Sequence, residues 1–240
     1  MSIETGAVRE SGATRLRGIR ACVFDAYGTL FDFASATARC DDVPADLRAS
    51  LSTLWRDKQL QYTWLRSLQG DYADFWQVTS DALDFALDSL GIANAPRHAR
   101  LMDLYMTLSA FPEVAGVLRQ LRQAGFVTAI LSNGTPAMLT AAVHAAGIGD
   151  LLDAVLSADA VGKYKTHPRV YEYGLRQLGL AAREVSFQSS NAWDAYAASA
   201  FGMRVVWCNR HGQREERLPG RPDHVIRSLD ELPALLEHAR

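Results

Sequence analysis

Short apolar runs alternate with helical patterns along most of this 240-residue chain. Apolar runs of this length, bounded by turn residues, are typical of buried parallel strands. They predict five strands, at residues 21–25, 126–132, 153–158, 184–189 and 204–209. Helical patterns fall between them at 113–125 and 136–148. This alternation predicts an α/β fold built on a doubly wound parallel sheet.

The stretch from residue 33 to 109 interrupts the alternation. It contains no convincing strand pattern, and amphipathic helical patterns follow one another at 44–70, 71–91 and 97–109. A helical block inserted after the first strand is predicted to form a cap over the sheet. The predicted organisation is an N-terminal extension at 1–18, a core domain at 19–32 and 110–240, and a helical cap at 33–109.

Charge and composition exclude several classes of partner. The net charge is −2, and without a basic face or polybasic run the sequence gives no case for nucleic acid or a membrane surface. No apolar run approaches the roughly 20 residues of a membrane helix, and the first residues lack the apolar core of a signal peptide. The three cysteines have neither zinc-site nor disulfide spacing. We therefore expect a cytoplasmic protein that acts on a small molecule.

Polar residues follow several of the predicted strands. In an open α/β sheet, ligands bind at the carboxyl ends of the strands, so these residues are predicted to face one pocket. They are Asp25, Ser132, Asn133, Ser189, Asn191 and Asp194, with Lys165 on the loop between the third and fourth strands. None of the six histidines forms an HxH or HxxxH pair, so no histidine metal site is predicted.

Four segments resemble the motifs of the haloacid dehalogenase superfamily, in the same order. They are FDAYGTLFD (24–32), LSNG (131–134), the loop lysine in YKTHPRVY (164–171) and SSNAWD (189–194). SSNAWD and the cap segment LWRDKQLQYTWLRSL (54–68) resemble, more narrowly, the L-2-haloacid dehalogenases. The resemblance covers residues 19–230 and implies a Rossmann-like core with a helical cap.

Most members of the superfamily are phosphatases, and Tyr27 stands where those phosphatases carry a second acid. Those phosphatases use it as a general acid, and they hold Mg²⁺ with further acids in the fourth motif, where this chain has only Asp194. A carboxylate meeting a phosphate dianion about 4 Å away faces roughly 8 kcal/mol of repulsion at an effective dielectric constant near 20. Without cations to cancel that repulsion, a carbon–halogen bond is the better target for Asp25.

The resemblance assigns two chemical steps to particular residues. Asp25 would displace halide from Cα to form an ester, while Lys165 stabilises its carboxylate and Thr29 positions it. Arg56, in the cap, would receive the halide. Asp194 would then act as the general base for a water that hydrolyses the ester, supported by Ser189, Asn191, Lys165 and Tyr171.

The resemblance also implies a substrate pocket. Ser132, Asn133 and backbone N–H groups around Ala26 and Tyr27 would bind the substrate carboxylate or the halide. The apolar wall around Cα and the halogen would consist of Tyr27, Leu60, Phe75 and Trp193. Two positions depart from the family pattern: Asp57 follows Arg56 where Gln is frequent, and Thr166 follows Lys165 where Pro is usual.

The predicted reaction converts short (S)-2-haloalkanoates to (R)-2-hydroxyalkanoates plus halide, with inversion at Cα and without metal or cofactor. The resemblance further implies a homodimer. A fluoroacetate specialist of the same family and a Mg²⁺-dependent small-molecule phosphatase are the alternative enzymes. A third alternative, a non-catalytic binding protein, would be expected to have lost one of Asp25, Arg56, Lys165 or Asp194, and all are present.

Overall fold

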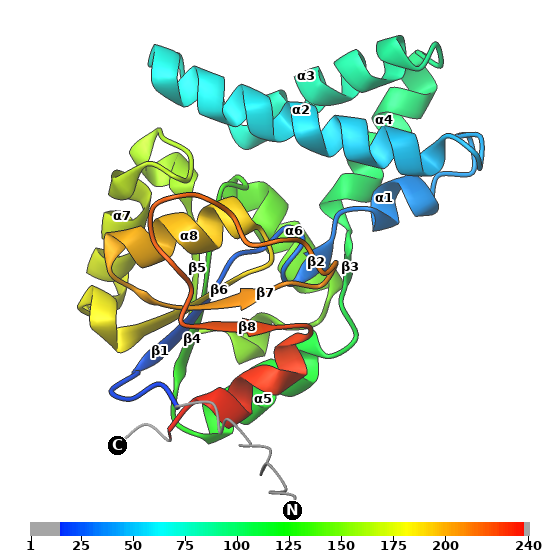
Figure 1. Ribbon diagram of the computed structural model, residues 1–240. Helices are drawn as coiled ribbons and strands as arrows, with labels where there is room; N and C mark the ends of the chain where they lie inside the picture. Colours follow the sequence, from blue (N-terminus) through cyan, green and yellow to red (C-terminus); the bar gives the residue numbers. More distant parts are fainter. Residues whose placement is uncertain (1–14, 238–240) are drawn as a thin grey trace, which may run out of the picture.

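The computed structural model describes residues 15–237, and its centre is a six-stranded parallel sheet (Figure 1). The strand order is β5-β4-β1-β6-β7-β8, so β1 lies between β4 and β6. The strands are β1 Ala21–Phe24, β4 Val127–Ser132, β5 Ala154–Ser157, β6 Val185–Ser189, β7 Arg204–Cys208 and β8 His224–Ile226. The predicted doubly wound parallel sheet is confirmed, and β8 is an additional edge strand.

Helices cover both faces of this sheet (Figure 1). Because side chains alternate along a strand, Cys22 and Phe24 of β1 pack with α5 and α6, whereas Ala21 and Val23 pack with α7 and α8. These helices are α5 Val114–Gln123, α6 Pro136–Ala145, α7 Pro168–Leu178 and α8 Ala192–Phe201. Short 3-10 helices are η1 Gly149–Leu151, η2 Ala158–Val161, η3 Ala182–Glu184 and η4 Leu229–Leu235.

A separate group of helices stands beyond the carboxyl ends of the strands (Figure 1). It consists of α1 Ser35–Ala38, α2 Arg48–Gln69, α3 Phe75–Ser89 and α4 Ala95–Met106. Local signals fix the helix ends: Gly70 ends α2 in the left-handed conformation, and the Asp74 carboxylate accepts a hydrogen bond from the Gln77 N–H at the start of α3. These helices are called the cap below.

Two very short strands connect the cap to the rest of the chain. Strand β2 (Phe31–Asp32) pairs antiparallel with β3 (Ser109–Ala110), at the two points where the chain enters and leaves the cap. Strands of two residues carry no periodic pattern, so the sequence did not indicate them.

The predicted N-terminal extension, residues 1–18, lies mostly outside the described residues. Leu16 is nevertheless buried and forms a parallel bridge with Leu236. This short piece therefore belongs to the core. Within residues 15–237, no helix is long and apolar enough to cross a membrane.

Candidate active site

Asp25 directly follows β1, and three side chains hold its carboxylate. The Thr29 hydroxyl and the Asn191 amide donate to Oδ2 at 3.0 and 2.8 Å, and the Lys165 ammonium donates to Oδ1 at 3.1 Å. Gly28 makes the intervening turn possible, since its φ of 89° is costly for other residues. Both carboxylate oxygens are thus fixed in a buried site.

Lys165 also joins Asp25 to a second carboxylate. Its ammonium donates to Asp194 Oδ2 at 2.7 Å, and the Tyr171 hydroxyl donates to Asp194 Oδ1 at 2.7 Å. All four side chains are buried, so these charges interact strongly. The sequence-predicted residues Asp25, Lys165, Asp194 and Tyr171 therefore form one continuous network.

Burial and neighbouring charges set the protonation of this network. Burial alone would lower the pKa of Lys165, but the carboxylates of Asp194 and Asp25 outweigh it and raise the pKa above its usual value. Lys165 therefore stays charged at neutral pH. Burial raises the pKa of Asp194 despite the opposing effect of Lys165. A raised pKa makes this carboxylate a better proton acceptor.

The residues present do not fit the magnesium site of the related phosphatases. Tyr27 stands where those phosphatases carry a second acid, and the amide of Asn191, not a carboxylate, meets Asp25 at 2.8 Å, so fewer acidic side chains are available to hold the ion. Within residues 15–237, no group of three or more His, Cys, Asp or Glu side chains is arranged to hold a metal ion.

Arg56 reaches the site from α2 of the cap. Its guanidinium donates to Asn191 Oδ1 at 3.3 Å, to the Tyr27 carbonyl at 3.5 Å and to Gln59 Oε1 at 2.7 Å. Asp57 is exposed, so the neighbouring acid points away from this guanidinium. The cap thus places a cation against Asn191, whose amide donates to the Asp25 carboxylate.

Gln59 is a site residue that sequence reasoning missed. Its fully buried amide accepts from Arg56 and donates to Thr79 Oγ1 and the Tyr105 hydroxyl at 2.7 and 3.2 Å. The available signal was its spacing of three residues from Arg56, which puts both side chains on one helix face. A lone glutamine in an amphipathic helix is ordinarily exposed, so that signal was weak.

Tyr27 lies in an aromatic cluster between core and cap. Its ring centroid is 5.6 Å from that of Phe75 and 5.5 Å from that of Tyr105. Beside this cluster, a hollow of about 10 Å³ is lined by Phe33, Ser52, Trp55, Arg56, Gln59 and Tyr105. That volume holds roughly one water molecule, so the cap is closed over the site.

The remaining predicted residues support the turns around the site. Ser132 Oγ accepts from the Gly134 N–H at 3.1 Å, and Asn133 Oδ1 accepts from the Lys165 N–H at 2.9 Å. Ser189 Oγ accepts from the Asn191 N–H at 3.1 Å. Asn133 therefore anchors the lysine backbone, which reaches the site although Thr166 follows it.

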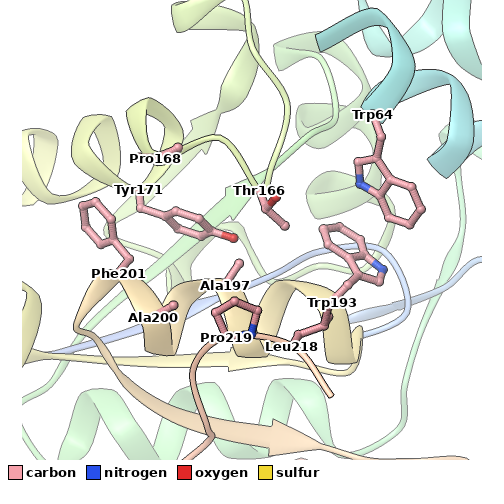
Figure 2. A pocket seen from close by; sticks show the side chains of 10 residues that line it. All are labelled: Trp64, Thr166, Pro168, Tyr171, Trp193, Ala197, Ala200, Phe201, Leu218 and Pro219. Atoms are coloured by element: carbon pink, nitrogen blue, oxygen red, sulfur yellow. The ribbon is translucent and has the colours of Figure 1, made fainter. Parts of the chain in front are cut away.

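Trp193 and Leu60 lie away from that hollow. Trp193 meets Trp64 of α2 edge-on, with ring centroids 5.5 Å apart, and both line an apolar groove of about 550 Å³ at the seam between cap and core (Figure 2). Tyr171 and Thr166 line the same groove. Leu60 is half-buried, one helical turn after Arg56 on α2.

Gly134 lies against the Tyr27 ring, so we expect Gly134→Ala to destabilise the protein. A Cβ at this position would lie 2.8 Å from Cε2 and from the hydroxyl oxygen of Tyr27. Overpacking of this kind lowers the free energy of unfolding by about 1–3 kcal/mol, measurable by urea unfolding. Gly116→Ala on α5 is the matched control, since no atom lies within 4 Å of its added Cβ. Equal stability of both variants would show that the Tyr27 ring moves freely.

Comparisons with known proteins agree with this geometry. The model of the haloacid dehalogenase-like hydrolase family matches residues 19–202. (S)-2-haloacid dehalogenase 1 of Pseudomonas sp. (strain CBS-3) is 47% identical over 219 residues, which are 91% of this chain and 96% of the relative.

Solved structures are similar over nearly the whole chain. A dehalogenase crystal structure is 46% identical, with a TM-score of 0.89, over 92% of this chain and 98% of the other. L-2-haloacid dehalogenase from Xanthobacter autotrophicus, solved with chloropropionic acid covalently bound, is 38% identical with a TM-score of 0.85. That match covers 90% of this chain and 98% of the other.

Proposed function

This chain belongs to the haloacid dehalogenase-like hydrolases, and from that membership we propose that it hydrolyses the carbon–halogen bond of short (S)-2-haloalkanoic acids. The products are the (R)-2-hydroxyalkanoic acid and halide. The observation that carries the proposal is the placement of Asp25, whose carboxylate accepts hydrogen bonds from the Lys165 ammonium and the Asn191 amide. Arg56 of the cap donates a hydrogen bond to the side chain of that same Asn191.

In the first step an Asp25 carboxylate oxygen attacks the substrate Cα, and the carbon–halogen bond breaks. The carboxylate needs no activating base, because the carboxylate anion is itself a nucleophile. The halide leaves with the bonding electrons toward the Arg56 guanidinium, which stabilises the developing charge. The structure records no hydrogen bond for the N–H groups of Ala26 and Tyr27 within residues 15–237, which leaves them available to an anionic substrate.

In the second step water attacks the carbonyl carbon of the Asp25 ester. Asp194 accepts a proton from that water, and hydrogen bonds from Lys165 and Tyr171 hold the Asp194 carboxylate in place. The bond between the Asp25 carbonyl carbon and the substrate oxygen then breaks, and the departing oxygen takes the proton back from Asp194 to give the hydroxy acid. The Asp25 carboxyl group loses its remaining proton to solvent, which restores the carboxylate. Cα is inverted once in the first step and is not touched in the second, so the (S) substrate gives the (R) product.

The cap supplies the remaining parts of the proposal. Residues 33–109 act as the lid that closes over the substrate, and the enzyme works as a homodimer. Exposed apolar side chains on α2 and α3 support a dimer interface there: Leu65, Leu68, Trp76 and Phe85.

A cytoplasmic location fits the three cysteines, which are all free thiols.

The test is halide release from racemic 2-chloropropionate in excess EDTA. We expect release to stop when half of the substrate is consumed, with (R)-lactate as the organic product, because only one enantiomer presents its halogen to Arg56. Fluoroacetate and a phosphate monoester are assayed in parallel. Phosphate release that appears only with added Mg²⁺, together with no halide from either acid, would overturn the proposal.

A further inference from the structure

The loop that carries Lys165 is attached to the cap as well as to the core. This lysine loop, residues 159–167, comprises most of η2 and the link from η2 to α7. On the core side, the Lys165 N–H donates to Asn133 Oδ1 at 2.9 Å. On the cap side, the loop meets the end of α2 and the link between α2 and α3.

Three hydrogen bonds make this second attachment. The Tyr164 hydroxyl donates to the Ala73 carbonyl at 2.5 Å, and the Tyr164 N–H donates to Ser67 Oγ at 3.3 Å. The Tyr72 hydroxyl donates to Asp159 Oδ1. Each bond joins a cap residue to the lysine loop, and Tyr164 directly precedes the lysine.

Aromatic packing strengthens the same attachment. The Tyr72 and Tyr164 rings lie 5.2 Å apart, and Tyr164 is completely buried. The Tyr164 ring also lies 6.1 Å from Phe75, which packs on Tyr27 in the active site. Burial and the hydrogen bond to Asp159 raise the pKa of Tyr72, so its hydroxyl stays protonated and remains a donor.

We propose that Tyr72 and Tyr164 are positioning residues that couple closure of the cap to the placement of Lys165. When the cap closes, these tyrosines hold the lysine loop so that the ammonium meets Asp25 and Asp194. When the cap opens, the same contacts break and the loop backbone beside the lysine keeps only its core-side hydrogen bond to Asn133, so the ammonium is held less firmly. This inference rests on the proposed function, because it concerns the relative rates of the two steps of that reaction.

The two carboxylates depend on Lys165 to different degrees. Thr29 and Asn191 also hold Asp25, so its attack on Cα tolerates a displaced lysine. Asp194 has only Tyr171 as a second side-chain partner within residues 15–237. Loosening the tyrosine contacts therefore slows ester hydrolysis more than ester formation.

The test measures both steps in Tyr72→Phe, which removes one hydroxyl and keeps the ring. We expect the rate constant of ester hydrolysis, followed by rapid acid quench and intact-protein mass, to fall about tenfold. Because kcat/KM for 2-chloropropionate reports only the steps up to halide loss, we expect kcat/KM to change less than twofold. Slower ester hydrolysis should lower kcat and KM together. A merely structural defect would lower the amount of active enzyme and leave KM unchanged.

Tyr62→Phe is the matched control, since Tyr62 lies on α2 and no hydrogen bond of its hydroxyl is recorded within residues 15–237. Asp159→Ala removes the acceptor of the same hydrogen bond, so the double variant should be no slower than Tyr72→Phe alone. An ester-hydrolysis rate constant equal to that of Tyr62→Phe would overturn the coupling while the proposed function stands. Absence of both halide and ester in the parent enzyme would overturn both.

Discussion

Asp25→Asn is expected to abolish halide release from 2-chloropropionate, with a loss of at least about 10⁴-fold in kcat. The amide keeps the shape of the carboxylate but has no negative charge with which to displace the halide, so no ester forms and the second step has no substrate. Ion chromatography for chloride and intact-protein mass for the ester check the two consequences separately.

The Asp25→Asn substitution also removes a charge from the buried network that contains Lys165 and Asp194, so the folding of the variant must be measured together with its activity. Lys165 keeps Asp194 as a partner at 2.7 Å when Asp25 loses its charge, and the variant should therefore remain folded. Asp57→Asn, an exposed acid on α2, is the matched control and should retain activity. A folded Asp25→Asn enzyme that still released halide at the parental rate would show that another group attacks Cα.

Arg56→Lys should give the second largest effect, a fall of about 10²–10³ in kcat/KM. The guanidinium makes three hydrogen bonds at once, to Gln59, Asn191 and the Tyr27 carbonyl. A lysine ammonium is a single point charge and cannot reproduce that planar arrangement beside a departing halide.

The leaving group distinguishes loss of halide stabilisation from loss of substrate binding. Chloride departs less readily than bromide, so the variant should lose more activity toward 2-chloropropionate than toward 2-bromopropionate. Arg100→Lys, at an exposed position of α4, serves as the control for the substitution itself. Equal losses with both substrates would contradict the assignment of Arg56 to the halide.

The sequence indicated the sheet well because its strands are buried on both faces. Strand β1 is a continuous apolar run, and β1, β4 and β6 have no exposed position after their first residues. Strand β8 was missed for the opposite reason: it has three residues, and Val225 is 50% exposed. The opposite edge strand β5 was indicated, because it has four residues and ends in the buried Leu156 and Ser157.

Some residues of the site were also easier to predict from the sequence than others. Asp25, Asn191 and Asp194 stand at or just after strand ends, so topology alone brings them together. Lys165 and Arg56 come from a loop and a cap helix. The strand order indicated only that Lys165 could face the pocket, and the roles of both residues depended on the resemblance to a known family. Gln59 carried only a weak signal and Tyr164 carried none, because their importance depends on contacts between segments distant in sequence.

The Trp64–Trp193 contact gives this protein an optical reporter of its own movement. One indole belongs to the cap and the other to the core, and their rings meet at 81°. The closed hollow beside Arg56 holds only about one water, so the proposed opening of the cap for substrate would also separate these rings. Tryptophan fluorescence and near-ultraviolet circular dichroism should therefore change with each opening, without any attached dye. Trp64→Phe should remove that signal, which would let the cycle of the cap be timed against the release of halide.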